Sequence, residues 1–185
     1  MKFNDHSALS GAHAFLSASK YHWLNYSPDK LVESFRTAQA AAKGTRLHEL
    51  AAEHIRLKMR MPRNKATFNR YVNDAIGFRM TPEQALFYSV NCFGTADAIS
   101  FEKGLLRIHD LKTGVTPAKI DQLMVYAALF CLEYDVRPME IEYELRIYQN
   151  DDVAVSNPTG EEVARVMDII IQFDKLIEKV KEEEA

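Results

Sequence analysis

The segment "GTADAISFEKGLLRIHDLKTG", residues 94–114, contains two stretches of alternating apolar and polar residues separated by a short turn sequence, EKG. The alternation predicts two strands, over residues 93–101 and 105–111. Gly104 can adopt the positive φ that a tight turn between such strands requires. The sequence therefore predicts an antiparallel hairpin at this point of the chain.

The predicted hairpin carries three charged residues. Asp110 and Lys112 are two positions apart, so a strand would place them on one face, and the partner strand carries Asp97. Converging carboxylates repel each other, and a hard cation such as Mg²⁺ or Mn²⁺ relieves that repulsion. A lysine beside such an ion can hold or activate a water for attack on a phosphate. The alternative is a surface hairpin whose exposed aspartates pair with Lys112.

Four helices are predicted before the hairpin, from apolar residues at helical spacing and from capping signals. The second would begin after an N-cap at Ser27 and end near Gly44, and the fourth would begin at Thr81 and Pro82, with Gln84 closing a capping box. A basic loop would separate the third helix from the fourth. The predicted helices cover residues 10–23, 29–42, 45–59 and 81–90, and the loop covers residues 60–68.

After the hairpin we expect a helix capped by Thr116, a half-buried strand over residues 139–149, and a helix that begins at Thr159 with Glu162 completing a capping box. This order of elements predicts an α/β (α+β) sandwich, with helices flanking a small central mixed β-sheet. One domain would span residues 1–185. Its parts would be a mostly helical region (1–90), a catalytic hairpin, helix and strand (91–149), and a C-terminal helix (157–185).

Composition places the chain among ordinary globular proteins, with 47% hydrophobic and 26% charged residues in a chain of 185. No apolar run approaches the roughly 20 residues of a membrane span. The first ten residues contain no apolar segment of the signal-peptide kind, so we expect a cytoplasmic protein without a membrane partner. Its two cysteines, Cys92 and Cys131, suit a reducing compartment and are too few for a four-cysteine zinc or iron–sulfur site.

Charge is unevenly distributed along the chain. The formal net charge is −3, yet residues 43–79 contain nine basic residues and three acidic ones, a local charge of +6. Residues 133–185 contain fifteen acidic and six basic residues, a local charge of −9. A basic segment of this kind would supply phosphate contacts to DNA next to the predicted cation site. The candidate DNA-binding residues are Lys43, Arg46, Arg56, Arg60, Arg63 and Lys65.

Three further residues are candidates for the same site. His48 lies on a predicted helix rich in basic residues, where a histidine is either a metal ligand or a part of the core. Gln122 and Tyr126 are four residues apart and share one face of the helix after the hairpin. They could hydrogen-bond a phosphate or support the metal ligands, and they could equally form a local surface pair.

Four segments, "GTRLHELA" (44–51), "GTADAI" (94–99), "LRIHDLKTG" (106–114) and "DQLMVYA" (121–127), occur in this order. Together they resemble the RecB-like nuclease branch of the PD-(D/E)XK superfamily. That branch carries a helix histidine, an aspartate after a glycine, D-x-K followed by Thr-Gly, and Gln-x-x-x-Tyr. The resemblance is close over residues 48–127 and loose over residues 15–23. After residue 127 it is only at the level of the fold. It implies a restriction-endonuclease-like core.

Carried over to this chain, the resemblance implies that His48, Asp97, Asp110 and the backbone carbonyl of Leu111 bind Mg²⁺ or Mn²⁺. It implies that Lys112 orients or activates the attacking water. Gln122 and Tyr126 would contact the DNA backbone or support the site. Many relatives hold an iron–sulfur cluster through four cysteines, and this chain departs from them because it has two.

The resulting hypothesis is a metal-dependent DNA nuclease, an exonuclease of recombination, repair or phage DNA processing in a bacterial or phage-infected cell. The alternatives are a structure-specific endonuclease and a non-catalytic DNA-binding or assembly protein on the same fold. A recombinase or single-strand annealing protein is the expected partner, and a homo-oligomer is left open. The motifs do not indicate the digestion polarity or the preferred strand state of the nucleic acid.

Overall fold

The structure, a computed structural model, describes residues 14–184, apart from the side chains of residues 19–21. The chain divides into two compact units, Met1–Thr45 and Arg46–Ala185. The second unit contains the sheet and every residue of the predicted metal site. The first unit, in its described part, consists of the short helix η2 and the first part of the helix α1.

The described residues contain short and long helices together with five strands. In chain order these elements are η2 (Ala18–Asn25), α1 (Pro28–Arg56), α2 (Thr67–Gly77), β1 (Thr81–Ser89), β2 (Cys92–Glu102), β3 (Leu105–Leu111), α3 (Asp121–Glu133), η3 (Pro138–Glu140), β4 (Glu142–Gln149), β5 (Asp152–Ser156) and α4 (Gly160–Glu184).

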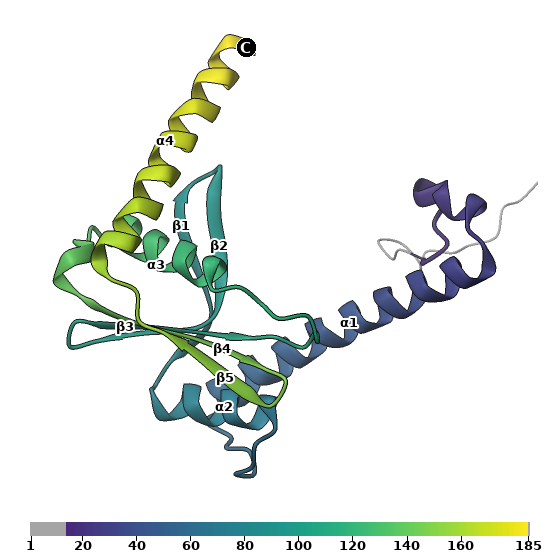
Figure 1. Cartoon of the computed structure of the whole chain (residues 1–185), viewed down its shortest axis with the longest axis horizontal. Helices are drawn as coiled ribbons and strands as arrows, with labels where there is room; N and C mark the ends of the chain where they lie inside the picture. Colours follow the sequence, from purple (N-terminus) through teal and green to yellow (C-terminus); the bar gives the residue numbers. More distant parts are fainter. Residues whose placement is uncertain (1–13, 185) are drawn as a thin grey trace, which may run out of the picture. The chain divides into compact units, whose positions relative to one another are not determined.

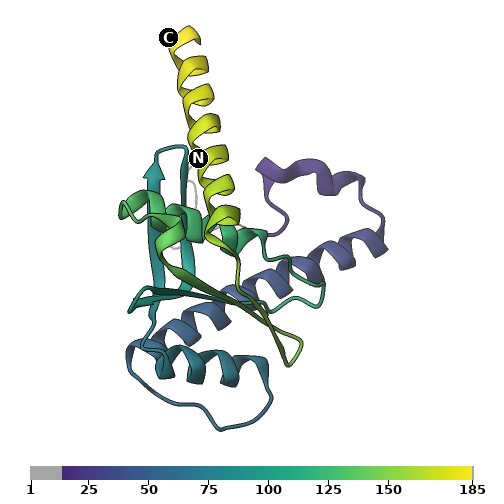
Figure 2. The same cartoon turned by 60° about the vertical axis from the view of Figure 1, so that its left-hand side comes forward.

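Within residues 14–184 the strands form one mixed sheet in the order β1-β2-β3-β4-β5. The β3–β4 pair is parallel, and α3 makes the crossover between these two strands, whereas the other pairs are antiparallel. Helices α2 and α3 lie on opposite faces of the sheet (Figures 1 and 2). The predicted α+β architecture with a small mixed sheet between helices is therefore confirmed.

The predicted hairpin is present as β2 and β3. Glu102 pairs with Leu105, so the loop consists of Lys103 and Gly104 alone. Both have positive φ, 53° and 78°, which is the backbone of a type I′ turn. The turn fixes the register of the two strands, and Ala98 pairs with His109.

The helix predicted over residues 81–90 is wrong, because this segment is the edge strand β1. Its side chains alternate, with Leu86 buried and Phe87 half exposed, as a strand with one covered face requires. Pro82 pairs with Ala98 without breaking the sheet, because an edge strand has one side that donates to no neighbour. In the described part of the region 1–90, the last segment is therefore a strand and not a helix.

The helices before β1 also differ from the prediction. Gly44 does not end a helix, since α1 runs without interruption from Pro28 to Arg56. The N-terminal helix is the short 3-10 segment η2, and the start of the predicted range, residues 10–13, lies outside the described residues. No element was expected after the basic loop, where the structure has the amphipathic helix α2. Ser27 does accept a hydrogen bond from the backbone N–H of Lys30, as an N-cap should.

Helix α3 begins at Asp121 and not after Thr116, so the predicted cap is wrong. The segment before α3 is instead bound by the side chain of Gln149, at the end of β4. Its amide donates to the carbonyls of Gly114 and Thr116, and its carbonyl accepts from the N–H of Ala118 at 3.0 Å. These bonds hold the backbone in a loop in place of a helical turn.

The last third of the chain follows the prediction with one addition. Strand β4 is half buried, with Tyr143, Leu145 and Ile147 on its covered face. The additional strand β5 pairs with β4 and was not expected. Helix α4 begins with the predicted capping box, in which Thr159 Oγ1 accepts from the N–H of Glu162 at 3.2 Å and Glu162 accepts from the N–H of Thr159 at 2.8 Å.

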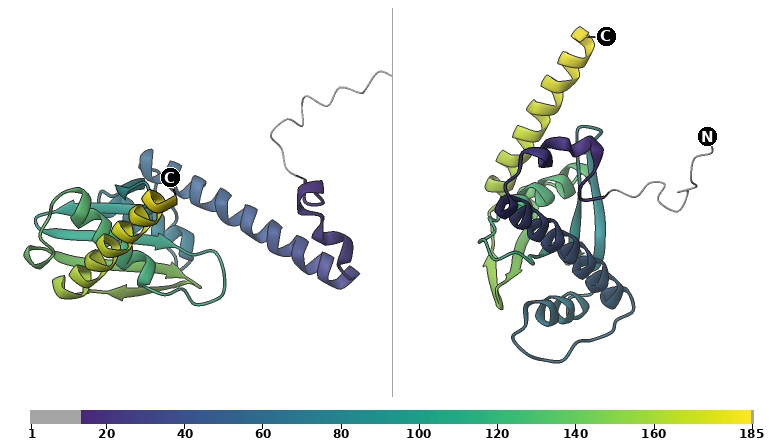
Figure 3. Two further views of the ribbon diagram at one scale, coloured as in Figure 1. Left: turned by 90° about the horizontal axis from the view of Figure 1, so that it is seen from above. Right: turned by 90° about the vertical axis from the view of Figure 1, so that its right-hand side faces the viewer.

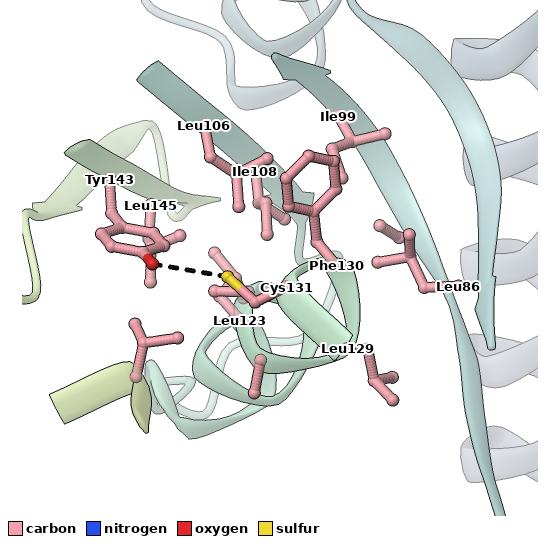
Figure 4. Close-up of a cluster of buried hydrophobic side chains, with 14 of the residues drawn as sticks. Leu86, Ile99, Leu106, Ile108, Leu123, Leu129, Phe130, Cys131, Tyr143 and Leu145 are labelled. Carbon is pink, nitrogen blue, oxygen red and sulfur yellow. Dashed lines mark hydrogen bonds between the residues drawn. The ribbon is translucent and has the colours of Figure 1, made fainter. Parts of the chain in front are cut away.

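Each face of the sheet has its own hydrophobic core. The larger core lies between the sheet and the helices α3 and α4, which lie on the same side of it (Figures 3 and 4). In this core the hydroxyl of Tyr143 and the thiol of Cys131 are in contact at 3.4 Å. The smaller core joins the sheet to α2 and the end of α1, around Tyr71 and Tyr148. Side chains that alternate along β3 therefore enter different cores.

Candidate active site

The two aspartates of the hairpin meet at the end of β3, on the face that α3 covers. Ile108 belongs to the larger core, and Asp110, two residues later, points to the same side. Asp97 lies on β2 and accepts a hydrogen bond from the N–H of Leu111 at 2.8 Å through Oδ2. The register set by the type I′ turn thus brings Asp97 beside Asp110.

Lys112 completes the group from just beyond the strand. Its ammonium donates to Asp110 Oδ1 at 3.1 Å and lies 3.0 Å from Oδ2. Both carboxylate oxygens of Asp110 are therefore in contact with the same ammonium, and the buried Oδ2 accepts no other hydrogen bond among the described residues. The backbone N–H of Lys112 donates to the carbonyl of Tyr148 on β4, at 2.9 Å, which holds the lysine at the edge of the parallel pair.

Helix α3 contributes the predicted pair of polar side chains. Lys112 Nζ also donates to Gln122 Oε1 at 2.8 Å, and Gln122 Nε2 donates to the hydroxyl of Tyr126 at 3.1 Å. Gln122 and Tyr126 occupy successive turns of α3, as their spacing predicted. Gln122 binds the site lysine and Tyr126 binds Gln122, so the two residues are not an isolated surface pair.

His48 of α1 joins the group at its other end. Its Nδ1 lies 3.3 Å from Asp97 Oδ1, and the imidazole is about one-third exposed. The hydrogen bond with Asp97 raises the pKa of His48, and the charge of Asp110 adds to this effect, although partial burial opposes it. His48 is therefore a partly exposed residue of the site and not a core histidine.

These residues form one connected set, which we call the polar cluster. Its members are His48, Asp97, Asp110, Lys112, Gln122 and Tyr126, and it contains all the predicted catalytic side chains. Burial raises the pKa of the Asp110 carboxyl, and the nearby charge of Asp97 raises it further, while Lys112 and His48 oppose the shift. A second positive charge near the two carboxylates would lower the cost of keeping Asp110 ionised.

The donor set suits a hard divalent cation. Within residues 14–184 no three His, Cys, Asp or Glu side chains gather closely enough to hold an ion by themselves. His48 of α1 does, however, contact Asp97 of β2, and Asp97 accepts from the N–H that follows Asp110 on β3, whose last carbonyl is that of Leu111. Among the described residues, Oδ2 of Asp110 accepts no hydrogen bond at this place other than its contact with the Lys112 ammonium. The residues present therefore fit Mg²⁺ or Mn²⁺.

Gly94 has a role that the sequence reasoning missed. A Cβ atom at this position would lie 2.9 Å from Cε1 of Tyr126, closer than real side chains approach. The absence of a side chain on β2 therefore leaves the space in which the Tyr126 ring reaches Gln122. The signal was present in the sequence, because a glycine within a strand often marks a close approach of another group.

The predicted DNA-binding residues are distributed over α1 and the loop that follows it. Lys43 and Arg46 are exposed on α1, the latter two residues before His48. Arg56 forms an ion pair with Glu83 at 2.6 Å. The remaining three lie in the exposed loop between α1 and α2, on the other side of the sheet from Asp110, and they are Arg60, Arg63 and Lys65.

A second polar network, on the α2 face, was also missed. The Tyr148 hydroxyl donates to Asp74 Oδ2 at 2.8 Å, so its oxygen accepts from Nδ1–H of His109, 3.3 Å away. Arg146 lies 3.5 Å from the same Asp74 oxygen and 3.2 Å from Glu144. Alternation along the strand did indicate that His109 faces away from Asp110, but the partners come from distant segments.

Comparison of the chain with protein-family models and with the sequences of curated proteins gives no match. In the part of the chain that the structure describes, no helix combines the length and the apolar character that crossing a membrane requires.

Proposed function

We propose that the chain is a divalent-metal-dependent deoxyribonuclease built on a restriction-endonuclease-like core. The observation that carries this proposal is the connected polar cluster. Its six residues come from four elements: α1, β2, β3 with the position just after it, and α3. The first and the last of them, His48 and Tyr126, are 78 positions apart in the sequence. A set of stray surface charges has no reason to converge in this way.

The proposed metal ligands are His48, the carboxylates of Asp97 and Asp110, and the backbone carbonyl of Leu111. A bound Mg²⁺ or Mn²⁺ supplies Lewis acidity toward a phosphate oxygen and lowers the pKa of a coordinated water. Asp97 is oriented by the N–H of Leu111, and this hydrogen bond leaves its Oδ1 directed to His48. The backbone of β3 thus holds one of the proposed metal ligands, Asp97, in place.

Lys112 is the proposed water-positioning residue. Its ammonium is held from two sides, by Asp110 and by Gln122, and is still about 29% exposed. An ammonium so placed can orient a water toward a phosphorus atom and stabilise negative charge that develops there. Gln122 and Tyr126 then act by positioning the lysine, and their outer atoms remain near enough to solvent to contact the DNA backbone.

The wider expectations belong to the same proposal. DNA is the substrate and an exonuclease is the preferred activity, with recombination, repair or phage DNA processing as the setting. The proposed location is the cytoplasm of a bacterial or phage-infected cell, and the proposed partner is a recombinase or single-strand annealing protein. The proposal allows a homo-oligomer but does not require one.

The test is a time course of end-labelled linear DNA with Mg²⁺ or Mn²⁺, comparing the wild type with Lys112→Ala. We expect the wild type to shorten the DNA and the variant to be slower by about 10²–10⁴-fold, because the group that orients the water is lost. Lys175→Ala, an exposed lysine on α4, is the matched control and should cleave at the wild-type rate.

Equal rates for Lys112→Ala and the wild type would refute the proposed function. A circular duplex distinguishes the two nuclease alternatives, because a strict exonuclease leaves it intact and an endonuclease cuts it. Tight binding of DNA without cleavage in either metal would favour the non-catalytic alternative.

A further inference from the structure

A basic hollow surrounds the C-terminal end of α2, on the sheet face opposite the polar cluster. It consists of three adjoining depressions of about 540, 630 and 640 Å³. Gly77 and Phe78 line the first two, Arg60 lines the second and third, and Arg79 lines the first and third. The shared residues show that the depressions adjoin one another, and we call the three together the α2 hollow.

Basic side chains dominate the lining of the α2 hollow. Asp74 and Glu102 are its acidic members, and Asp74 is engaged by the Tyr148 hydroxyl and by Arg146. The basic members are Arg56, Lys58, Arg60, Arg63, Arg70, Arg79, Lys103 and Arg107. This concentration of positive charge contrasts with the formal net charge of −3 of the whole chain.

Most of these cations are not neutralised by the protein. Arg56 pairs with Glu83, and Arg107 pairs with Glu144. Arg70 donates only to a backbone carbonyl, that of Asp151. Within residues 14–184, none of the other basic members of the hollow forms an ion pair with a carboxylate. Uncompensated charges of one sign repel one another, and an anionic ligand removes that repulsion.

The aromatic residue of the hollow indicates which kind of anion it suits. The guanidinium groups of Arg107 and Arg146 lie 4.5 and 4.9 Å from the ring centroid of Phe78. Phe78 is thus already occupied by cation–π contacts with the protein's own arginines. The hollow therefore offers charged guanidinium groups as hydrogen-bond donors and, among the described residues that line it, no free aromatic ring on which a base could stack. This favours binding of a phosphodiester backbone over binding of a base.

We propose that the α2 hollow binds the phosphate backbone of DNA at a segment away from the point of cleavage. The inference rests on the proposed function for the identity of the nucleic acid. Helix α2 covers His109, whereas Asp110 faces α3, so a phosphate in the hollow is not the one attacked at the polar cluster. The hollow therefore contributes affinity for long DNA, without sequence preference, and makes no contact with the reacting phosphate.

The test compares Arg60→Gln/Arg63→Gln with the matched pair Arg137→Gln/Arg165→Gln, whose arginines are exposed near α4 and on it. Binding of a labelled linear duplex is measured by fluorescence anisotropy without divalent metal, over a range of salt. In about 0.1 M salt, losing two phosphate contacts should raise Kd roughly tenfold and reduce the salt slope by about two. The control pair should bind as the wild type does.

A second measurement separates this inference from the proposed function. Hydrolysis of a small chromogenic phosphodiester, the p-nitrophenyl ester of thymidine 5′-monophosphate, with Mn²⁺ requires only the polar cluster. Arg60→Gln/Arg63→Gln should hydrolyse it at the wild-type rate while binding the duplex more weakly. Both arginines are exposed, so the melting temperature of this variant should be unchanged.

The inference is overturned if the two double variants bind the duplex equally well, even when the wild type cleaves DNA. Weaker binding by Arg60→Gln/Arg63→Gln supports the α2 hollow even if the wild type hydrolyses nothing, in which case the proposed function alone fails.

Discussion

His109 and Asp110 are neighbours on β3, point to opposite faces of the sheet and are both buried, with 0% and 2% of their surfaces exposed. Asp110 lies beside a partly exposed ammonium, that of Lys112, which is 3.1 Å from its Oδ1 and 3.0 Å from its Oδ2. His109 lies under Phe78 and Tyr148, in edge and tilted ring contacts, and its Nε2 has no partner among residues 14–184. Alternation along the strand therefore places Asp110 beside the polar residues of the α3 face and His109 among the aromatic rings of the α2 face.

The difference shows how one strand can serve two purposes. On the α3 face the charges remain close to solvent, because His48, Lys112 and Asp97 keep 32%, 29% and 21% of their side-chain surfaces exposed. On the α2 face burial lowers the pKa of His109 to about 3, with the charges of Arg146 and Arg107 acting in the same direction. That imidazole is neutral and contributes packing, not proton transfer.

Asp110→Asn should produce the largest effect and should separate activity from stability. Loss of a proposed metal ligand should lower the rate of DNA cleavage by roughly 10⁴-fold. The folded-state pKa of Asp110 lies above the ordinary 3.8, so keeping the carboxylate ionised costs stability as pH rises through that pKa. At neutral pH the amide removes this cost, and the melting temperature should stay the same or rise.

The matched control is Asp168→Asn, an exposed aspartate on α4, which should keep wild-type activity. A large fall in the melting temperature of Asp110→Asn, with cleavage retained, would mean that Asp110 is a structural residue like His109.

The second prediction concerns acid stability and His109. Its pKa is 6.5 in the unfolded chain and about 3 in the folded one, so below pH 6.5 the unfolded chain binds a proton that the folded chain does not. The free energy of unfolding should therefore fall as pH falls, by about 2 kcal/mol between pH 6.5 and about pH 4.5 for this group. His109→Phe removes the group, and its urea unfolding curves should lose that much of the pH dependence.

The readout is the difference between the two stability–pH curves, because other groups contribute equally to both. At about pH 8 His109 is neutral in both states, and the curves should be parallel there. Curves that stay parallel down to about pH 4.5 would show that His109 is open to solvent protons, as the residues of the α3 face are.

Gly94→Ala tests the smaller contribution of packing to the α3 face. The new methyl group would meet the Tyr126 ring at 2.9 Å, and the ring must move. We expect a loss of stability of about 1 kcal/mol, from overpacking, and a fall in cleavage of about tenfold as Lys112 loses its support through Gln122. Unfolding and cleavage assays measure the two effects.

Gly77→Ala is the control for the unfolding measurement alone, since a methyl group there would meet nothing within 4 Å. If the hydroxyl of Tyr126 transmits the effect, Tyr126→Phe should lower cleavage similarly and the double variant should show no further loss. Additive losses would show that Gly94 acts through some other contact.

Elements with a strong local signal could be predicted from the sequence. The hairpin followed from period-2 alternation and a turn glycine, and α4 followed from its capping box. Both depend on residues close together in the chain. The six residues of the polar cluster were expected to group because of a resemblance to a family, since periodicity carries no information on contacts between distant segments.

The failures arose where distant residues determine the local backbone. β1 has a helix-like start at Thr81 and Pro82, but pairing with β2 decides its structure. The residues after Thr116 would suit a first helical turn, and Gln149, far along the chain, holds them as a loop. Gly44 lowers helix propensity by about 1 kcal/mol, which the rest of the long helix α1 outweighs.

The hydrogen bonds from β4 have a consequence for the order of folding. Lys112 is bound through its backbone to Tyr148, and the loop leading to Gln122 is bound by the side chain of Gln149. Parallel pairing of β3 with β4 requires closure of a long connection, which is a slow step compared with forming the hairpin. A nascent chain that ends before β4 therefore contains all six residues of the polar cluster but lacks the bonds from Tyr148 and Gln149 that hold Lys112 and the loop before α3. The hairpin can place Asp97 beside Asp110 first, and the position of Lys112 and α3 would be fixed only after β4 has been synthesised and has joined the sheet.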